Sequence, residues 1–110
     1  MYKFQKSMDV ATLNIIKTTI LQLFPTCKIV LFGSRARSDN QEDSDYDLMI
    51  ILDKQMSPME KIPYRTQIRK TLLQYGIFSD ILIQSNTEVE QKKKLTGHIV
   101  KTIVNEGVEL

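Results

Sequence analysis

The chain has 110 residues, of which 42% are hydrophobic and 25% are charged, and its net charge is +2. These values are ordinary for a globular protein, so we expect a single domain over residues 1–110 with a buried core. The apolar runs are too short to span a membrane, and no long apolar segment follows the first residues, so we expect no signal peptide. Cys27 is the only cysteine, which rules out an internal disulfide and favours a reducing, cytoplasmic location.

The first half of the chain is predicted to alternate helix and strand. Ser7 can cap a first helix, which Pro25 ends. Strands are expected over 28–32 and 46–52, with a short helix over 34–37 between them. One side of the first helix is apolar and contains Val10, Leu13, Ile16, Ile20 and Leu23.

A further helix is expected after the second strand. Residues 57–60, Ser-Pro-Met-Glu, have the pattern of a capped helix start with proline at the first helical position. Because Pro63 does not fit comfortably in a helix interior, we expect a short turn there. The main helix is then predicted from about 63 to 75, where Gly76 stops it.

The remainder of the chain continues the alternation. A third strand is predicted over 77–84, and residues 87–90, Thr-Glu-Val-Glu, have the pattern of a second capping box. Gly97 is expected to separate that helix from a last helix over 98–105. His98, the only histidine, is interpreted as a surface or capping residue. The alternation predicts an α/β fold.

The most informative segment runs from the end of the first strand into the second. A Gly33-Ser34 turn follows the first strand, and Asp45 and Asp47 stand at the start of the second strand. Residues i and i+2 of a strand point to the same face, with Cα atoms roughly 7 Å apart. Two carboxylates in this arrangement can converge on divalent cations.

Charge patterning supports a cation site. Residues 39–53 hold six of the 13 acids and no lysine or arginine. Carboxylates about 5 Å apart repel by roughly 3 kcal/mol at an effective dielectric constant near 20, so a fold that gathers them needs a metal ion or a shifted pKa. Asp39, Glu42 and Asp43 are interpreted as members of a solvated loop. Asp47 instead enters a buried strand, and Asp80 has the same setting in the third strand.

The Gly33-Ser34 turn suits a phosphate, because Gly33 has no Cβ and Ser34 offers an amide and a hydroxyl at a helix start. Simple capping by Ser34 is the alternative, and the two roles are compatible. Arg35 and Arg37 could contact phosphates or a partner, or be exposed arginines of a short helix. Arg37 is taken as a candidate nucleotide-binding residue.

These motifs, in the order strand, Gly-Ser, short helix, ten-residue spacer, Asp-x-Asp strand, helix and Asp-bearing strand, resemble the polymerase-β-type nucleotidyltransferases. The resemblance covers nearly the whole chain and is closest to the minimal, stand-alone branch, which includes antitoxin partners of HEPN-domain toxins. It implies a nucleotidyltransferase fold with a small mixed sheet of three or four strands and flanking helices. Many members have Gly where this chain has Ser38, which puts only the turn after the short helix in question.

The resemblance also implies chemistry. Asp45, Asp47 and Asp80 would hold two Mg²⁺ ions and act in catalysis, and Gly33 and Ser34 would hold the phosphates of ATP or another nucleoside triphosphate. A nucleoside monophosphate, expected to be AMP, would pass to an acceptor hydroxyl without a covalent enzyme intermediate.

The sequence allows more than one acceptor for the nucleotide. The resemblance favours a HEPN-type partner protein, whereas an aminoglycoside-like small molecule modified by a homodimer and a non-catalytic binding antitoxin are the alternatives. The lysines of 92–94 are interpreted as a solvated helix face, so direct nucleic-acid binding is not expected.

Overall fold

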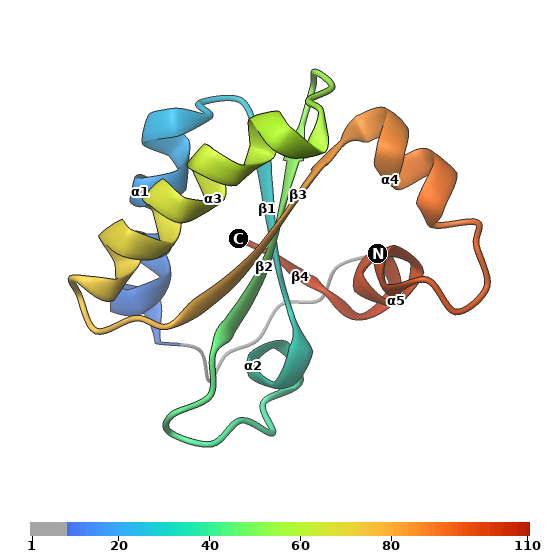
Figure 1. The fold of residues 1–110 in the computed structure, drawn as a ribbon. Coiled ribbons are helices and arrows are strands. Elements are labelled where there is room, and N and C mark those ends of the chain that lie inside the picture. The colour runs from blue at the N-terminus through green and yellow to red at the C-terminus, as the bar shows by residue number, and fades with distance from the viewer. Residues whose placement is uncertain (1–8) are drawn as a thin grey trace.

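The computed structural model describes residues 9–110 and contains a four-stranded mixed sheet with helices on both faces (Figure 1). The strand order is β3-β2-β1-β4, in which β2 and β3 are parallel and the other neighbours are antiparallel. This architecture confirms the expected α/β class and the small mixed sheet. The elements in chain order are α1 (Val10–Leu23), β1 (Lys28–Phe32), α2 (Gly33–Arg37), β2 (Tyr46–Leu52), α3 (Pro58–Leu73), β3 (Ser79–Ser85), α4 (Asn86–Lys92), α5 (Ile99–Glu106) and β4 (Val108–Glu109).

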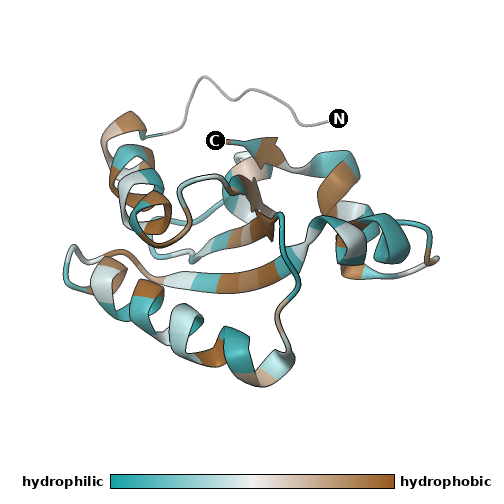
Figure 2. Ribbon diagram, turned by 90° about the horizontal axis from the view of Figure 1, so that it is seen from above, coloured by the Kyte–Doolittle hydropathy of each residue, from teal (hydrophilic) through white to brown (hydrophobic). Residues whose placement is uncertain are grey.

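The sheet divides the interior into two apolar layers. Alternate residues of a strand point to opposite faces, so β2 contributes Leu48 and Ile50 to one layer and Met49 and Ile51 to the other. The larger layer packs against α1 and α3, and the smaller one packs against α4 and α5, as the placement of the helices in Figure 1 shows. Figure 2 shows the hydrophobic colour gathered along the central strands, where both layers meet.

Strand register fixes the positions of the acidic residues. Asp47 pairs with Phe32 of β1 on one side and with Asp80 of β3 on the other. Helix α2 lies at this same end of the sheet, where β1 ends and β2 begins (Figure 1). The Gly-Ser turn and two of the three predicted acids therefore meet at one end of the sheet.

The predicted bounds of β1 and β2 are confirmed. The first helix begins at Val10, and its N-cap is Asp9, whose carboxylate accepts hydrogen bonds from the amides of Ala11 and Thr12. Ser7, the predicted cap, lies outside the described residues. Val10 is exposed rather than part of the core, because it begins the helix beyond the edge of the apolar layer.

The expected turn at Pro63 is wrong, because α3 runs without interruption from Pro58 to Leu73. Pro63 removes only the hydrogen bond to the carbonyl of Met59, which lies in the exposed first turn of the helix. The capping box of Ser57 and Glu60 stabilises that turn from the other side. A proline this close to a well-capped helix start is therefore tolerated.

Two other predicted boundaries are also wrong. The capping box of α4 consists of Ser85 and Glu88, two residues before the expected one, and β3 begins at Ser79 rather than at 77. Pairing of Ser85 with Leu52 holds residue 85 at the end of the sheet, so the helix can begin directly after it. His98 is confirmed as a capping residue, since its Nδ1 accepts a hydrogen bond from the amide of Val100.

The capping box of α4 also binds a buried lysine. Lys61 of α3 is 6% exposed, and its Nζ lies 2.9 and 3.1 Å from the two carboxylate oxygens of Glu88. Burial raises the pKa of Glu88, but the hydrogen bond from the Ser85 amide and the bonds and charge of Lys61 outweigh it and hold that pKa below its ordinary value. The ion pair thus joins α3 to α4 across the end of the sheet.

We predict that Glu88→Gln destabilises the protein at neutral pH by roughly 2–3 kcal/mol, because the buried Lys61 loses its charged partner. Since the folded-state pKa of Glu88 is lowered, its contribution is present above the unfolded value of 4.5 and is lost as the pH falls below it. Urea unfolding of the two proteins should therefore give curves that converge in acid. Glu90→Gln, in the exposed pair with Lys93, is the matched control and should change stability little. Equal effects of the two substitutions would contradict the interpretation.

Candidate active site

Three carboxylates lie at the end of the sheet next to α2. Asp47 is the second residue of β2 and is half-buried, whereas Asp80 and Asp45 are exposed. Asp47 and Asp80 are direct partners on neighbouring parallel strands, which places them on the same face at the usual strand separation of about 4.8 Å. Asp45 comes one residue before the strand. The structure therefore brings the expected Asp45, Asp47 and Asp80 to one region.

The electrostatics of Asp47 reflect this grouping. Burial raises the pKa of Asp47, the negative charges of Asp80 and Asp45 raise it further, and the positive charge of Arg37 lowers it in part. Asp45 and Asp80 are therefore close enough to Asp47 for their charges to raise its pKa. Among residues 9–110, however, no three His, Cys, Asp or Glu side chains are already drawn together as a metal cluster.

Gly33 has a steric role that sequence reasoning missed. Its φ is +75°, and a Cβ at this position would overlap Oδ2 of Asp47 and lie 3.1 Å from Cγ of that residue. The absence of a side chain at position 33 therefore makes room for the carboxylate of Asp47. Ser34 follows at the start of α2, so the Gly-Ser turn lies directly beside this acid.

Arg35 holds the loop that leads to the acids. Its guanidinium donates hydrogen bonds to the carbonyl oxygens of Ser44, at 2.8 and 3.1 Å, and of Glu42, at 3.1 Å. Its Cζ lies 4.2 Å from the centre of the Tyr46 ring. Because these contacts fix the residues on both sides of Asp45, Arg35 positions the Asp-x-Asp segment. Residues 39–53 contain no lysine or arginine, and this was the sequence signal that could have pointed to Arg35 as the cation that holds the loop.

The turn after α2 keeps the conformation that glycine would favour. Ser38 has φ 62° and ψ 27°, and the amides of Ser38 and Asp39 both donate to the carbonyl oxygen of Ser34. The departure from glycine at this position therefore leaves the turn intact. A left-handed conformation costs a residue with a side chain about 1–2 kcal/mol, which the hydrogen bonds must offset.

Arg37, in the last turn of α2, is close enough to Asp47 for its charge to lower the pKa of that residue. Its Nε is 3.1 Å from Oδ2 of Asp39, and both side chains are more than half exposed, so this ion pair can exchange for another anion. Arg37 and Gly33 also line a cavity of about 220 Å³ whose other wall is α5, including Thr102 and Glu106. No sequence pattern connects α5 with the Gly-Ser turn, since about 70 residues separate them.

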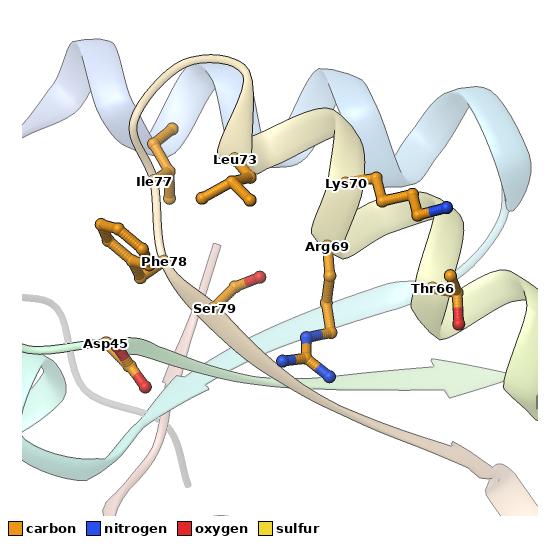
Figure 3. Close-up of a pocket in the computed structure, with 8 residues that line it drawn as sticks. All are labelled: Asp45, Thr66, Arg69, Lys70, Leu73, Ile77, Phe78 and Ser79. Atoms are coloured by element: carbon orange, nitrogen blue, oxygen red, sulfur yellow. The ribbon is translucent and has the colours of Figure 1, made fainter.

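A larger cavity of about 440 Å³ lies on the α3 face of the sheet, and Asp45 is one of the residues that line it. Figure 3 shows Asp45 at one end, the second half of α3 above, and the segment that leads into β3 beside it. Asp45 therefore adjoins the cavity under α3, whereas the carboxylate of Asp47 lies on the α5 side of the sheet, where Gly33 lines the smaller cavity.

Comparison with known proteins places this arrangement in a family. Residues 14–110 match the family described as polymerase beta, nucleotidyltransferase. Two proteins of Methanocaldococcus jannaschii are each 32% identical to this chain. The candidate protein adenylyltransferase MJ0141 aligns over 83 residues, or 76% of this chain and 77% of that protein. The candidate protein adenylyltransferase MJ0604 aligns over 80 residues, or 73% of each chain.

A solved structure has the same fold. A candidate minimal nucleotidyltransferase superposes with a TM-score of 0.59 and 22% identity, over 96% of this chain and all of that one. The fold is that of a nucleotidyltransferase core, and the match over residues 14–110 shows that this chain belongs to the polymerase-β-type nucleotidyltransferase family. Within the described residues, no helix is long and apolar enough to cross a membrane.

We predict that Gly33→Ala destabilises the protein more than Gly76→Ala does. Both glycines have nearly the same positive φ, but a Cβ at position 76 meets no atom within 4 Å, whereas one at position 33 meets Asp47. Gly76→Ala should cost about 1 kcal/mol of backbone strain, and Gly33→Ala should cost roughly 1–2 kcal/mol more. Urea unfolding of both variants measures the difference. Equal losses would show that the carboxylate of Asp47 does not depend on the space at Gly33.

Proposed function

We propose that this protein transfers AMP from ATP to a hydroxyl group of a partner protein, with Mg²⁺ as cofactor. The observation that carries the proposal is the direct pairing of Asp47 with Asp80, with Asp45 beside them and the Gly33-Ser34 turn against Asp47. Carboxylate oxygens are the ligands that Mg²⁺ prefers. The negative charges of Asp80 and Asp45 lie near this carboxylate, so a bound cation would relieve their repulsion. The residues present thus fit the metal.

Each residue has a role in the proposed reaction. Asp45, Asp47 and Asp80 would hold two Mg²⁺ ions, which when bound supply Lewis acidity to the hydroxyl and charge neutralisation to the triphosphate. Gly33 and Ser34 would bind phosphate oxygens through their amides, and Arg37 would add a positive charge from the last turn of α2. These groups orient the triphosphate beside the acids.

The proposed bond changes are a single displacement at phosphorus. A new bond forms between the acceptor oxygen and the α-phosphorus, and the bond from the α-phosphorus to the oxygen that bridges to the β-phosphate breaks. Pyrophosphate leaves with that oxygen. The hydroxyl proton passes to Asp80, which is exposed at the edge strand and therefore accessible to an acceptor. No bond forms between the nucleotide and the protein.

The acceptor is proposed on two grounds. The two relatives from Methanocaldococcus jannaschii are candidate protein adenylyltransferases, which supports a protein acceptor and AMP as the group transferred. The sequence resembles the minimal branch that includes antitoxin partners of HEPN toxins, so we propose a HEPN-type protein as the acceptor. Modification of its hydroxyl residue would then neutralise it.

We predict that Mg²⁺ and ATP, mixed with this protein and its proposed HEPN-type partner, increase the mass of the partner by one AMP group. Asp47→Asn and Asp80→Asn should each reduce the transfer rate at least about a hundredfold, since even residues behind metal ligands often change activity by 10–100-fold. Asp43→Asn, in the solvated loop, is the matched control and should keep the parent rate. Intact-mass spectrometry and release of pyrophosphate measure the reaction.

Two results would contradict this proposal in different ways. Full transfer activity in the Asp47→Asn variant would show that the acids do not form the catalytic site. Inhibition of an unmodified partner, to the same extent by the parent and by the Asp45/Asp47 double variant, would show that binding alone neutralises it.

Asp47→Asn removes a carboxylate whose charged form is disfavoured by burial and by its neighbours. Its melting temperature without metal should therefore equal or exceed that of the parent, which separates lost activity from lost folding.

A further inference from the structure

The cavity of about 220 Å³ between α2 and α5 lies on the sheet face that carries the carboxylates of Asp47 and Asp80. Strand alternation sends these two side chains to the same side as Met49 and Leu82, which belong to the smaller apolar layer. Phe32, which lines the cavity, packs against that layer too. Figure 1 shows α4 and α5 together on this side of the sheet. A group in the cavity is therefore on the same face as the proposed metal ligands.

One wall of the cavity belongs to the proposed triphosphate site. Gly33 and Arg37 line it, and they stand four residues apart, on one face of α2. The cavity is smaller than the pockets of about 300–1,000 Å³ that enclose a whole drug-sized ligand. It therefore has room for one part of a nucleotide whose phosphates are bound along α2.

The opposite wall, formed by α5, does not suit a phosphate. Ile99 and Ile103 make it apolar, and Ile99 is 52% exposed. Glu106 adds a carboxylate that forms no ion pair with any residue from 9 to 110. A carboxylate without a cationic partner repels a phosphate, and apolar side chains offer it no hydrogen bond. This wall therefore favours an uncharged group that can donate a hydrogen bond.

A purine base is such a group, and the nucleotide brings it to this face of the sheet. Its flat ring can cover apolar side chains, and an exocyclic amino group can donate a hydrogen bond to Glu106. Thr102 stands four residues before Glu106, on the same face of α5, and its hydroxyl can donate to a ring nitrogen. A ribose offers hydroxyl groups but no flat apolar face for Ile99 and Ile103.

We infer that the α5 wall selects the base of the triphosphate, with Glu106 accepting a hydrogen bond from the 6-amino group of adenine and Thr102 donating one to a ring nitrogen. The inference rests on the proposed function, because it assigns the base preference of the same site. Guanine has a carbonyl oxygen at position 6. In the same orientation it would set that oxygen against the carboxylate, so Glu106 favours ATP over GTP.

The test is isothermal titration of the full chain, in the presence of Mg²⁺, with ATP and with purine riboside triphosphate, which lacks the 6-amino group. The parent should bind ATP about fivefold more tightly, the effect of one hydrogen bond to an exposed carboxylate. Glu106→Ala should abolish this preference, whereas Glu106→Gln, which keeps an acceptor oxygen, should retain it in part. Because both ligands carry the same triphosphate, the ratio of their affinities cancels any effect of the lost charge on the phosphates. Equal affinities in the parent, or a preference that survives Glu106→Ala, would overturn the inference.

Two further variants separate the base contact from general effects. Glu109→Ala is the matched control, because it removes the same charge from an exposed residue that does not line the cavity, and it should keep the preference for ATP. Thr102→Val removes the hydroxyl at nearly constant shape. It should weaken both ligands several-fold and equally, since both contain the ring nitrogens. Loss of the preference in Glu109→Ala would overturn the assignment of Glu106, and unchanged affinities in Thr102→Val would overturn that of Thr102.

Two other ligands test the orientation of the nucleotide. Tripolyphosphate has no base, so Glu106→Ala and Thr102→Val should not weaken its binding. If Glu106→Ala instead tightens ATP and tripolyphosphate by the same factor, the carboxylate faces the phosphates and the inference is overturned. Tighter binding of GTP than of ATP by the parent would assign the wall to guanine and overturn the assignment to adenine.

The outcomes for the inference and for the proposed function are distinguishable. Saturable binding of triphosphates without any base preference defeats only the inference, and AMP transfer to the partner can still be observed. If no triphosphate binds in the presence of Mg²⁺, the proposed function fails and the inference fails with it. Thr102 and Glu106 are both exposed, so their substitutions should leave the melting temperature close to that of the parent, which separates lost recognition from lost folding.

Discussion

The carboxylate of Asp47 fills the space that a side chain at position 33 would occupy, and this contact links the two motifs of the site. It requires β1 and β2 to pair in the register that sets Phe32 opposite Asp47, so that the turn after β1 folds over the start of β2. It also requires glycine at a φ of +75°. The separate register of β2 with β3 sets Asp80 on the opposite side of Asp47. A shift by one residue would turn Asp47 to the other face and remove all of these contacts.

The structure maintains this contact against electrostatic repulsion. The charges of two further carboxylates raise the pKa of Asp47, and only the charge of Arg37 lowers it. Apolar packing on both faces of the sheet fixes the strands, and Arg35 fixes the loop through the carbonyl oxygens of Glu42 and Ser44. The fold thus holds negative charges together that would separate in an open chain. Such preorganisation suits a site that stabilises a reaction of a highly charged substrate.

The sequence predicted those parts whose signal is local. The strands at 28–32 and 46–52 are mostly apolar, and Asp47 near the start of the second had no structural explanation in the core. Boundaries failed where two local signals overlapped: Ser85 and Thr87 each have a glutamate three residues later, and only strand pairing selects Ser85. The contact of Gly33 with Asp47 and the cavity wall formed by α5 depend on tertiary packing, so no local pattern could indicate them.

The pKa of the Asp47 carboxyl, measured by NMR titration without metal, tests the central claim most directly. The grouping of acids predicts a value above the ordinary 3.8, because burial and the charges of Asp80 and Asp45 all disfavour ionisation. It also predicts that Asp80→Asn lowers this value, since one of the like charges is removed. A pKa at or below 3.8 that does not respond to Asp80→Asn would contradict the claim that these carboxylates form one site.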